Sequence, residues 1–436
     1  MRMARGATAA LAGALLAATA VVGASAADAA PGPGTVSERS ERTVDTAPAR
    51  SADRAQRGSA VSWSPPLAGE AVGVTVSGRT VRLAAERERP GPTRADGHGA
   101  IGTPGLLTLP VRHMDVPVDR VDAVLTLAAG SPGAAASVDV RGLRARGGWT
   151  EWEPGVPTSG PAAARTLTAA LPEPVVDVQA RLVLTLPTDA GWAMPGPVVR
   201  DLTLTAHVAT RTSATAKRDP RRYRVFATRE GLVGATTANG HVIGERDLFV
   251  ALPSRRALAP RDSSDYTVKV CAPTDRCAFA PVWDVGPWNT RDDYWNAEKR
   301  EQWRDLPPGV PQAQAARQDG YNGGKDQFGR TVLNPAGIDL ADGLFWDALG
   351  LTDNAWLTVD YLWTGDSPLA MVRVDGRVDL RNAPDAAARI VGLAADGAAV
   401  PLQCVAGSWL RVGTGQFLPA SAVPRQQWPR HLSGCR

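Results

Sequence analysis

The chain has 436 residues, enough for two to four domains, and 44% of them are hydrophobic, enough to build buried cores. The formal net charge is +4, but the basic residues are spread along the sequence, which argues against a nucleic-acid partner and is compatible with an anionic wall or membrane surface. The five histidines are scattered and no C-x-x-C pair is present, so we expect neither a metal site nor a cofactor.

The N-terminus has the order of a secretory signal peptide. Basic residues are followed by an apolar run from about Ala7 to Val22 and then by the small residues Ala24-Ser25-Ala26. This order predicts a signal peptide over residues 1–30, cleaved after Ala26 or Ala30. No other stretch approaches the ~20 apolar residues that a spanning helix needs, so we expect no transmembrane segment in the mature protein. The protein is therefore expected to be secreted, either extracellular or associated with the cell wall.

The four cysteines form an even set in a chain that is expected to meet oxidising conditions. Their spacing predicts one local disulfide between Cys271 and Cys277. It predicts a second disulfide between Cys404 and Cys435 near the chain end.

Linkers alternate with β-rich regions after the signal. Residues 31–59 are rich in Pro, Gly, Ser, Arg and Glu without apolar periodicity, which predicts a disordered linker. Residues 60–210 contain short alternating runs, such as Val121–Leu127 and Leu202–Thr205, between Gly/Pro-rich turns. This pattern predicts an accessory β-sandwich domain, followed by a polar, basic linker at 211–222.

One motif in the predicted sandwich has two interpretations. Trp149-Thr-Glu-Trp152 resembles the W-[ST]-E-W strand of accessory β-sandwich regions in secreted wall amidases and similar exported proteins. The two tryptophans either form a buried pair or present a surface for stacking against sugars.

The C-terminal segment, residues 367–436, has the motif order of another small β domain. It contains Met371–Val374, Val378–Pro384 and Ser408–Val412, with a Gly392 turn between the last two. This order resembles a bacterial SH3-like domain, and the resemblance implies a wall-binding module. A purely structural β-barrel cap is the alternative.

Residues 223–363 carry the most informative pattern. A polar T-A-N-G loop is followed by an L-P turn, a strand ending in D-x-G-P, an I-D-L segment and a closing L-G. In this order the motifs resemble the double-psi β-barrel of the rare lipoprotein A and expansin group. The matching residues are Thr237–Gly240, Leu252-Pro253, Asp284–Pro287, Ile338–Leu340 and Leu349-Gly350.

The chain departs from the family pattern at three positions. Val285 replaces the Arg of D-R-G-P, Ala341 replaces the Ser of D-L-S, and Phe249 takes the place of the His before the L-P turn. Residues 290–334 also lie between the two aspartate motifs as an insertion. These departures favour a barrel that binds glycan without cleaving it.

The resemblance also implies a set of site residues. Cleavage of a glycan needs a carboxylic acid that protonates the leaving oxygen. Asp339 is the candidate acid and Asp284 its partner. The residues expected to line the same groove are Thr236, Thr237 and Asn239, with Trp288 and Trp295 as surface rings that stack on sugars.

Both aspartates also have a structural interpretation. Asp339 precedes a predicted helix and could cap its first turn, because an aspartate there accepts backbone N–H bonds. Asp284 could be a turn former ahead of Gly286-Pro287.

We therefore expect a mainly β, multidomain, monomeric protein with an N-terminal β-sandwich, a double-psi β-barrel and a C-terminal SH3-like β-barrel. The first functional hypothesis is a secreted protein that binds peptidoglycan or another cell-wall polysaccharide and acts as a lytic transglycosylase. The second is a non-catalytic, expansin-like wall-binding or wall-loosening protein. The third is a secreted inhibitor or host-interaction protein, since fold alone does not fix function.

Overall fold

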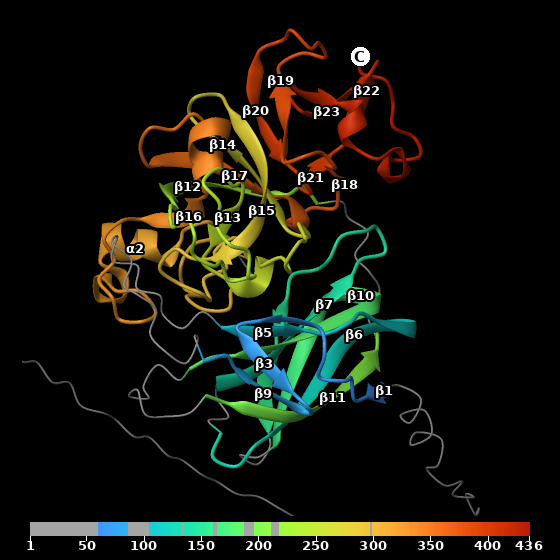
Figure 1. Ribbon diagram of the computed structural model, residues 1–436, viewed down its shortest axis with the longest axis vertical. Coiled ribbons are helices and arrows are strands. Elements are labelled where there is room, and N and C mark those ends of the chain that lie inside the picture. Colours follow the sequence, from blue (N-terminus) through green and yellow to red (C-terminus); the bar gives the residue numbers. More distant parts are fainter. Residues whose placement is uncertain are drawn as a thin grey trace, which may run out of the picture. The chain divides into compact units, whose positions relative to one another are not determined.

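The computed structural model describes residues 60–85, 104–131, 135–159, 164–186, 196–210, 218–296 and 299–436 (Figure 1). The described part of the chain is mainly β, as the sequence predicts. The predicted signal peptide, the linker at 31–59 and most of the linker at 211–222 lie outside the described residues.

The first sheet is built from β1 to β11, and all its strand pairs are antiparallel. The long strand β10 pairs with β6 and β9 along its first half and with β5 and β7 along its second half. The bounds are β1 (Ala60–Trp63), β2 (Glu70–Val72), β3 (Val74–Ser77), β4 (Thr80–Leu83), β5 (Gly105–Thr108), β6 (Arg112–Leu127), β7 (Ala136–Leu143), β8 (Glu153–Pro154), β9 (Val156–Ser159), β10 (Ala164–Leu184) and β11 (Val198–Val208).

Alternation of apolar residues explains how this sheet buries one face. In β6, Val121, Ala123, Leu125 and Leu127 are all buried, and the residues between them are more exposed. Because successive side chains of a strand point to opposite faces, these four residues belong to one apolar core together with residues of β7, β10 and β11. The predicted strands at Val121–Leu127 and Leu202–Thr205 are confirmed within β6 and β11.

Six strands of the second sheet close into a barrel. In the ring β13-β16-β12-β17-β14-β15, the last strand pairs back with β13, and the pairs β12–β16 and β13–β15 are parallel. The bounds are β12 (Arg221–Arg229), β13 (Val250–Leu252), β14 (Thr267–Cys271), β15 (Cys277–Val285), β16 (Ala336–Leu340) and β17 (Ala355–Tyr361).

The interior of this barrel is filled in a regular way. Each strand contributes two buried apolar residues that are two positions apart, as the period of a strand requires. The set is Val225 and Ala227, Val250 and Leu252, Val268 and Val270, Ala280 and Val282, Ile338 and Leu340, and Leu357 and Val359.

The two longer helical segments of the described residues lie in connections of this barrel. The insertion predicted at 290–334 contains α2 (Gln312–Asp319), and a helical segment at Gly343–Ala348 follows β16. The short 3-10 turns are Arg255–Ala257, Tyr321–Gly324, Leu362–Thr364, Ala420–Ala422 and Arg425–Gln427.

The C-terminal strands continue the second sheet. The parallel pair β15–β20 joins them to the barrel, and β18 and β21 form a separate two-stranded sheet. The bounds are β18 (Leu369–Met371), β19 (Arg377–Arg381), β20 (Ile390–Ala395), β21 (Ala399–Pro401), β22 (Cys404–Ala406), β23 (Trp409–Gly413) and β24 (Gln416–Pro419).

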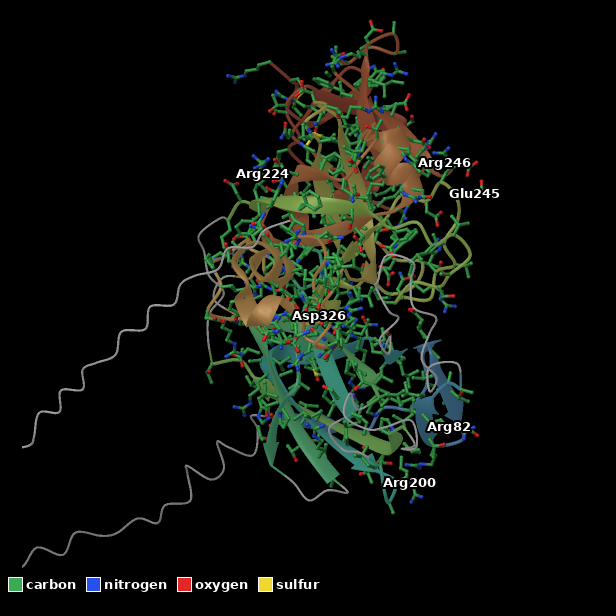
Figure 2. All side chains as sticks on the ribbon, turned by 90° about the vertical axis from the view of Figure 1, so that its left-hand side faces the viewer. Arg82, Arg200, Arg224, Glu245, Arg246 and Asp326 are labelled. Atoms are coloured by element: carbon green, nitrogen blue, oxygen red, sulfur yellow. A yellow bond between two sulfur atoms is a disulfide. The ribbon has the colours of Figure 1, made fainter. Side chains whose placement is uncertain are left out.

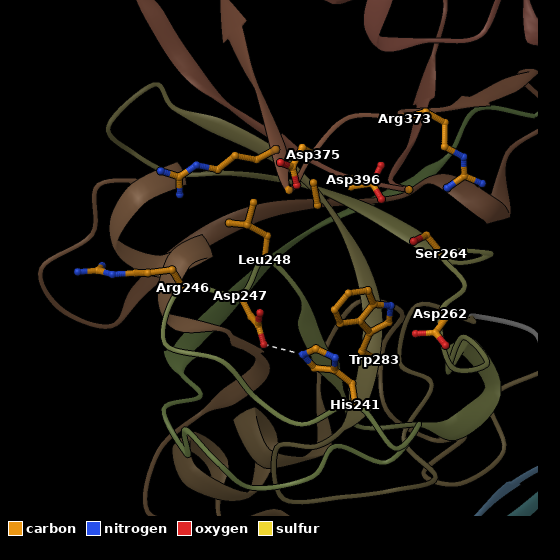
Figure 3. Close-up of a pocket in the computed structure, with 14 residues that line it drawn as sticks. His241, Arg246, Asp247, Leu248, Asp262, Ser264, Trp283, Arg373, Asp375 and Asp396 are labelled. Atoms are coloured by element: carbon orange, nitrogen blue, oxygen red, sulfur yellow. Dashed lines mark hydrogen bonds and ion pairs between the residues drawn. The ribbon is translucent and has the colours of Figure 1, made fainter.

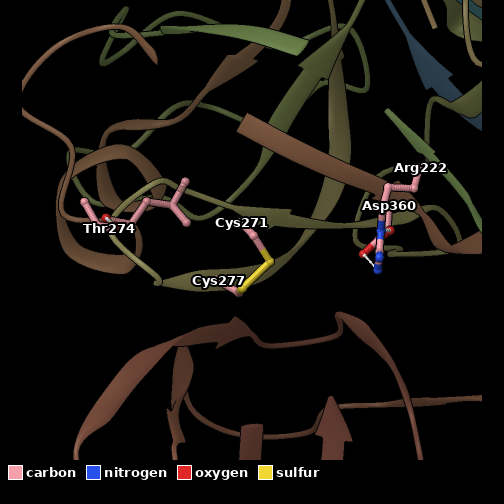
Figure 4. The surroundings of a disulfide bond; sticks show 6 residues. Arg222, Cys271, Thr274, Cys277 and Asp360 are labelled. Carbon is pink, nitrogen blue, oxygen red and sulfur yellow. Dashed lines mark hydrogen bonds and ion pairs between the residues drawn. A yellow bond between two sulfur atoms is a disulfide. The ribbon is translucent and has the colours of Figure 1, made fainter. Parts of the chain in front are cut away.

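Both predicted disulfides are confirmed. Cys271 and Cys277 are direct partners across the β14–β15 hairpin (Figure 4). Cys404 is bonded to Cys435, which fixes the end of the chain to β22.

Exposed arginines occur on several separate elements. Figure 2 labels Arg82 on β4, Arg200 on β11, Arg224 on β12 and Arg246 in the loop before β13, and all four are exposed. The distribution agrees with the spread of positive charge along the sequence.

Candidate functional site

The T-A-N-G loop is held by its own side chains. Thr237 Oγ1 donates to Asn239 Oδ1 at 2.7 Å, and the His241 backbone N–H donates to both of these oxygens, each at 3.1 Å. Thr237 and Asn239 are buried, whereas Thr236 is exposed. Thr237 and Asn239 therefore shape the loop and place His241, and only Thr236 is free to meet a ligand.

Asp284 fixes this loop to β15. Its Oδ1 accepts backbone N–H bonds from Ala238 at 2.7 Å and from Val285 at 2.8 Å. The Asn239 N–H also donates to the Trp283 carbonyl at 3.2 Å. The predicted neighbourhood of Asp284 and the T-A-N-G loop is present, and the carboxylate binds backbone amides there.

Asp284 and Asp339 lie on either side of the same residue of β13. Ala251 is in register with Asp284 on β15 and with Asp339 on β16. Since neighbouring strands are about 4.8 Å apart, the two aspartate backbones are roughly 10 Å apart. Asp339 accepts a hydrogen bond from Thr228, its register partner on β12.

A β-bulge explains this arrangement. The register between β13 and β15 shifts after Val282, so that Trp283 is the extra residue. A bulge redirects the side chains that follow it, and here it aligns Asp284 with Ala251 and Asp339 on one side of the sheet. Ile338 and Leu340 fill the barrel interior, so Asp339 between them points to the outer side.

The expected open groove is absent at the two aspartates. Asp284 is 5% exposed and Asp339 is 4% exposed. Ala238, Leu258 and Val285 pack against apolar residues of the first sheet, namely Val72, Leu106 and Val183. The first sheet thus covers the surface beside Asp284.

The interpretation of Asp339 as a helix cap is wrong. Asp339 lies within β16, and the residue that precedes the helical segment Gly343–Ala348 is Asp342. The strand continues through Asp339 because Ile338 and Leu340 are both needed inside the barrel.

Trp288 and Trp295 are buried, which overturns their prediction as surface rings. Trp288 is 3% exposed, packs against α2 and donates from Nε1 to Asn334 at 3.0 Å. Trp295 is fully buried, stacks on Tyr361 with a centroid distance of 5.2 Å and donates to Glu151 at 2.7 Å.

Two aspartates between these tryptophans, Asp292 and Asp293, are buried as well. Asp292 pairs with Arg300 inside the insertion, and Asp293 lies 3.3 Å from Arg256. Burial raises the pKa of Asp293 to about 6, and the positive charge of Arg256 opposes this shift.

The W-T-E-W segment, which is not a strand in the structure, and the following Glu153 contribute to the same network. Arg256 lies 3.2 Å from Glu151 and 2.7 Å from Glu153. Burial raises the pKa of Glu153 to about 7, and Arg256 opposes this shift. Burial alone would also raise the pKa of Glu151, but Arg256 and hydrogen bonds from Trp363 and Trp295 hold it below its usual value.

The buried interpretation of this motif is confirmed for Trp152. Its ring is fully buried, Nε1 donates to the Leu258 carbonyl at 3.1 Å, and the guanidinium groups of Arg141 and Arg181 each lie 4.3 Å from the ring centroid. Through Trp152 the motif joins the first sheet to the barrel, and this ring is not available for stacking against sugars.

A cavity of about 600 Å³ lies next to the bulge (Figure 3). His241 and Trp283 form one wall, and their ring centroids are 4.7 Å apart. His241 Nε2 is 2.6 Å from Asp247 Oδ2, and Trp283 Nε1 donates to the Ser263 carbonyl at 2.9 Å. The opposite wall comes from residues 373–377 and 395–397 of the C-terminal strands.

No motif of the sequence pairs His241 with Asp247. The sequence places His241 directly after the T-A-N-G loop, and this position is the one local indication that its ring belongs to the site. The His241 N–H donates to Thr237 and Asn239 of the loop, and these bonds hold the residue in place. The residues of the opposite wall lie more than 130 positions further along the chain, and no local pattern connects them with His241.

In the described ranges no helix is long and apolar enough to cross a membrane, and no group of three or more His, Cys, Asp or Glu side chains could hold a metal ion. Comparison with known proteins found no curated protein and no solved structure that matches the chain. Residues 221–360, which begin with β12 and end within β17, match the model of a family described as a domain of unknown function (DUF8814).

Proposed function

We propose that this protein is an exported cell-envelope protein that binds cell-wall glycan, with peptidoglycan as the main candidate, and does not cleave it. The cavity beside Trp283 is the binding site. The observation that carries the proposal is the half-buried Trp283 ring, which forms a wall of a cavity in the usual size range for ligand sites. A flat aromatic ring beside polar groups suits stacking against a sugar.

The barrel topology supports the resemblance to the rare lipoprotein A and expansin group. Six strands close with two parallel pairs, and the T-A-N-G loop, the end of β15 and the I-D-L segment of β16 meet at one row of residues. A double-psi barrel followed by an SH3-like module remains our proposal for the two β-barrel regions. Two disulfides are compatible with an extracellular location.

The burial and hydrogen bonding of Asp284 and Asp339 favour binding over cleavage. A general acid has to reach the glycosidic oxygen, but Asp284 and Asp339 are almost fully buried, and Asp284 already accepts two backbone N–H bonds.

The test is co-sedimentation of the purified protein with sacculi. Trp283→Ala is expected to weaken binding about tenfold, which corresponds to about 1.4 kcal/mol. Trp356→Ala is the matched control, because Trp356 is also half-buried but lies on β17 against Phe226. Equal binding by both variants and the unchanged protein would contradict the proposed site.

The alternative of lytic cleavage is favoured by one observation, the alignment of Asp339 and Asp284 on either side of Ala251. The same sacculus incubation decides between the alternatives. We expect no anhydromuropeptides in the supernatant. Release by the unchanged protein that is lost in Asp339→Asn but kept in Asp342→Asn would establish the catalytic alternative.

A further inference from the structure

The cavity beside Trp283 is built by two parts of the chain that are distant in sequence. The barrel supplies His241, Asp262, Ser264 and Trp283, and the C-terminal strands supply the segments around Arg373 and Asp396. A ligand in this cavity therefore contacts the six-stranded barrel and the C-terminal strands at once (Figure 3).

Ser264 is a largely buried polar residue that lines this cavity. It is 6% exposed, and its hydroxyl has no hydrogen-bond partner among the described residues. The residue lines the cavity, so its hydroxyl is placed to make a hydrogen bond with a polar group of a ligand there.

Arg373 lies next to Ser264. A Cβ atom added at Gly397 would be 2.7 Å from Ser264 Oγ and 3.4 Å from Arg373 Nη1, so both groups surround the same small residue. Arg373 makes no ion pair with any residue in the described ranges. A guanidinium and a hydroxyl in this arrangement can both donate hydrogen bonds to a carboxylate.

The other arginines of the cavity are already paired. Arg246 lies 3.1 Å and Arg377 lies 2.9 Å from the two carboxylate oxygens of Asp347. Their charge is thus partly neutralised from outside the cavity.

The carboxylates of the cavity make few bonds to the described residues. Asp262 and Asp375 make no side-chain bond to a described residue, and Asp396 uses one oxygen to accept from the Val374 N–H at 3.0 Å. The Asp396 N–H donates to the Gly376 carbonyl at 2.8 Å, which brings the segments of Asp375 and Asp396 together, and both residues line the cavity with Trp283 (Figure 3). A cation between these carboxylates and an indole ring gains both ionic and cation–π attraction.

We infer that the cavity binds a zwitterionic unit, with a carboxylate at Arg373 and Ser264 and an ammonium group between Trp283 and the pair Asp375 and Asp396. The unit is a short peptide end or diamino-acid residue that carries both free groups. This inference rests on the proposed function and specifies it, because it assigns recognition to the peptide branch of a wall polymer in addition to its sugar.

Four short probes test the charge requirement by isothermal titration calorimetry on the whole mature protein. The first is N-acetyl-alanyl-lysine with free ε-ammonium and free carboxylate. The others carry an Nε-acetyl group, a C-terminal amide, or both. We expect the first probe to bind at least tenfold more tightly than any other. Equal affinity for all four would overturn the inference.

Variants assign each charge to its partner. Arg373→Gln and Ser264→Ala are expected to weaken the free peptide at least fivefold while leaving the C-terminal amide unchanged. Asp375→Asn combined with Asp396→Asn is expected to remove the preference for the free ammonium. Arg389→Gln is the control and should have no effect, because Arg389 is exposed just before β20 and does not line the cavity. If Arg373→Gln lowered the affinity for all four probes equally, the assignment of the carboxylate to Arg373 would be contradicted.

Glucosamine oligomers provide the last comparison, because an amino sugar carries an ammonium group without a carboxylate. Binding of these oligomers as tight as that of the free peptide would contradict the carboxylate half of the site. Sacculus binding without any preference among the peptides would overturn this inference and leave the proposed function standing. Absence of sacculus binding with a retained peptide preference would overturn the proposed function alone.

Discussion

Asp284 shows how one side chain can organise a loop. Its Oδ1 accepts the Ala238 and Val285 amides, and the carboxylate is nearly inaccessible to water. A buried N–H that loses its acceptor costs about 1–3 kcal/mol.

The first prediction concerns this carboxylate. Asp284→Ala is expected to lower the free energy of unfolding by about 2–4 kcal/mol, because two backbone amides lose their acceptor. Asp284→Asn keeps an oxygen at the same place and should cost about half as much. Urea unfolding followed by circular dichroism measures both values.

Asp319→Ala is the control, since Asp319 is exposed at the end of α2. We expect it to change stability by less than about 0.5 kcal/mol. If Asp284→Ala were as stable as this control, the loop-anchoring role would be refuted.

Among the strands, the parallel pair β15–β20 has a specific steric requirement. Gly392 has φ 149°, and a Cβ atom there would lie 1.6 Å from the Cys277 carbonyl oxygen. Backbone atoms cannot move aside as a flexible side chain can, so only glycine allows β20 to approach β15 at this point.

Gly392→Ala is therefore expected to separate the two strands locally and to destabilise the protein by at least about 2–3 kcal/mol. Gly407→Ala is the matched control, because Gly407 also has a positive φ of 59° but no atom within 4 Å of the added Cβ. Hydrogen exchange at the β20 amides measures the local effect. Equal protection in the two variants would argue against the steric explanation.

Across the whole molecule, buried charges join the first sheet to the barrel. Glu151 and Glu153 of the W-T-E-W region face Arg256, and Asp293 of the insertion faces the same guanidinium. Lys299 is a further positive charge near Glu153. Breaking such a buried network by removing one partner costs more than a surface ion pair contributes.

The network predicts a pH dependence of stability. Burial raises the pKa of Glu153 to about 7 and that of Asp293 to about 6, so between pH 5 and 7 the folded protein binds protons that the unfolded chain has released. The free energy of unfolding should therefore fall as pH rises through this range, by up to about 3 kcal/mol for Glu153 alone. Glu151 and Asp139 have lowered pKa values and add stability that is lost only at more acidic pH.

Urea midpoints at pH 5.5 and pH 8 measure this slope. Glu153→Gln is expected to flatten it, whereas Glu245→Gln, at an exposed site in a loop of the barrel, should leave it unchanged. A slope of the same size in Glu153→Gln would exclude Glu153 as the titrating group.

The sequence by itself determined the local features of this protein. Alternating apolar residues fix the strands, because the period of a strand is a property of the backbone. The pairing of Cys271 with Cys277 follows from their separation of six residues, and the T-A-N-G loop meets Asp284 as the order of motifs implied.

Only the tertiary structure decided which surfaces stay open. Trp295 is buried because Glu151, 144 residues earlier, accepts its N–H, and Asp284 is covered because the first sheet packs beside it. The cavity wall opposite His241 comes from the C-terminal strands, which β15 and β20 bring into place. Burial depends on contacts between segments far apart in the chain, and the local pattern of residues contains no information about those contacts.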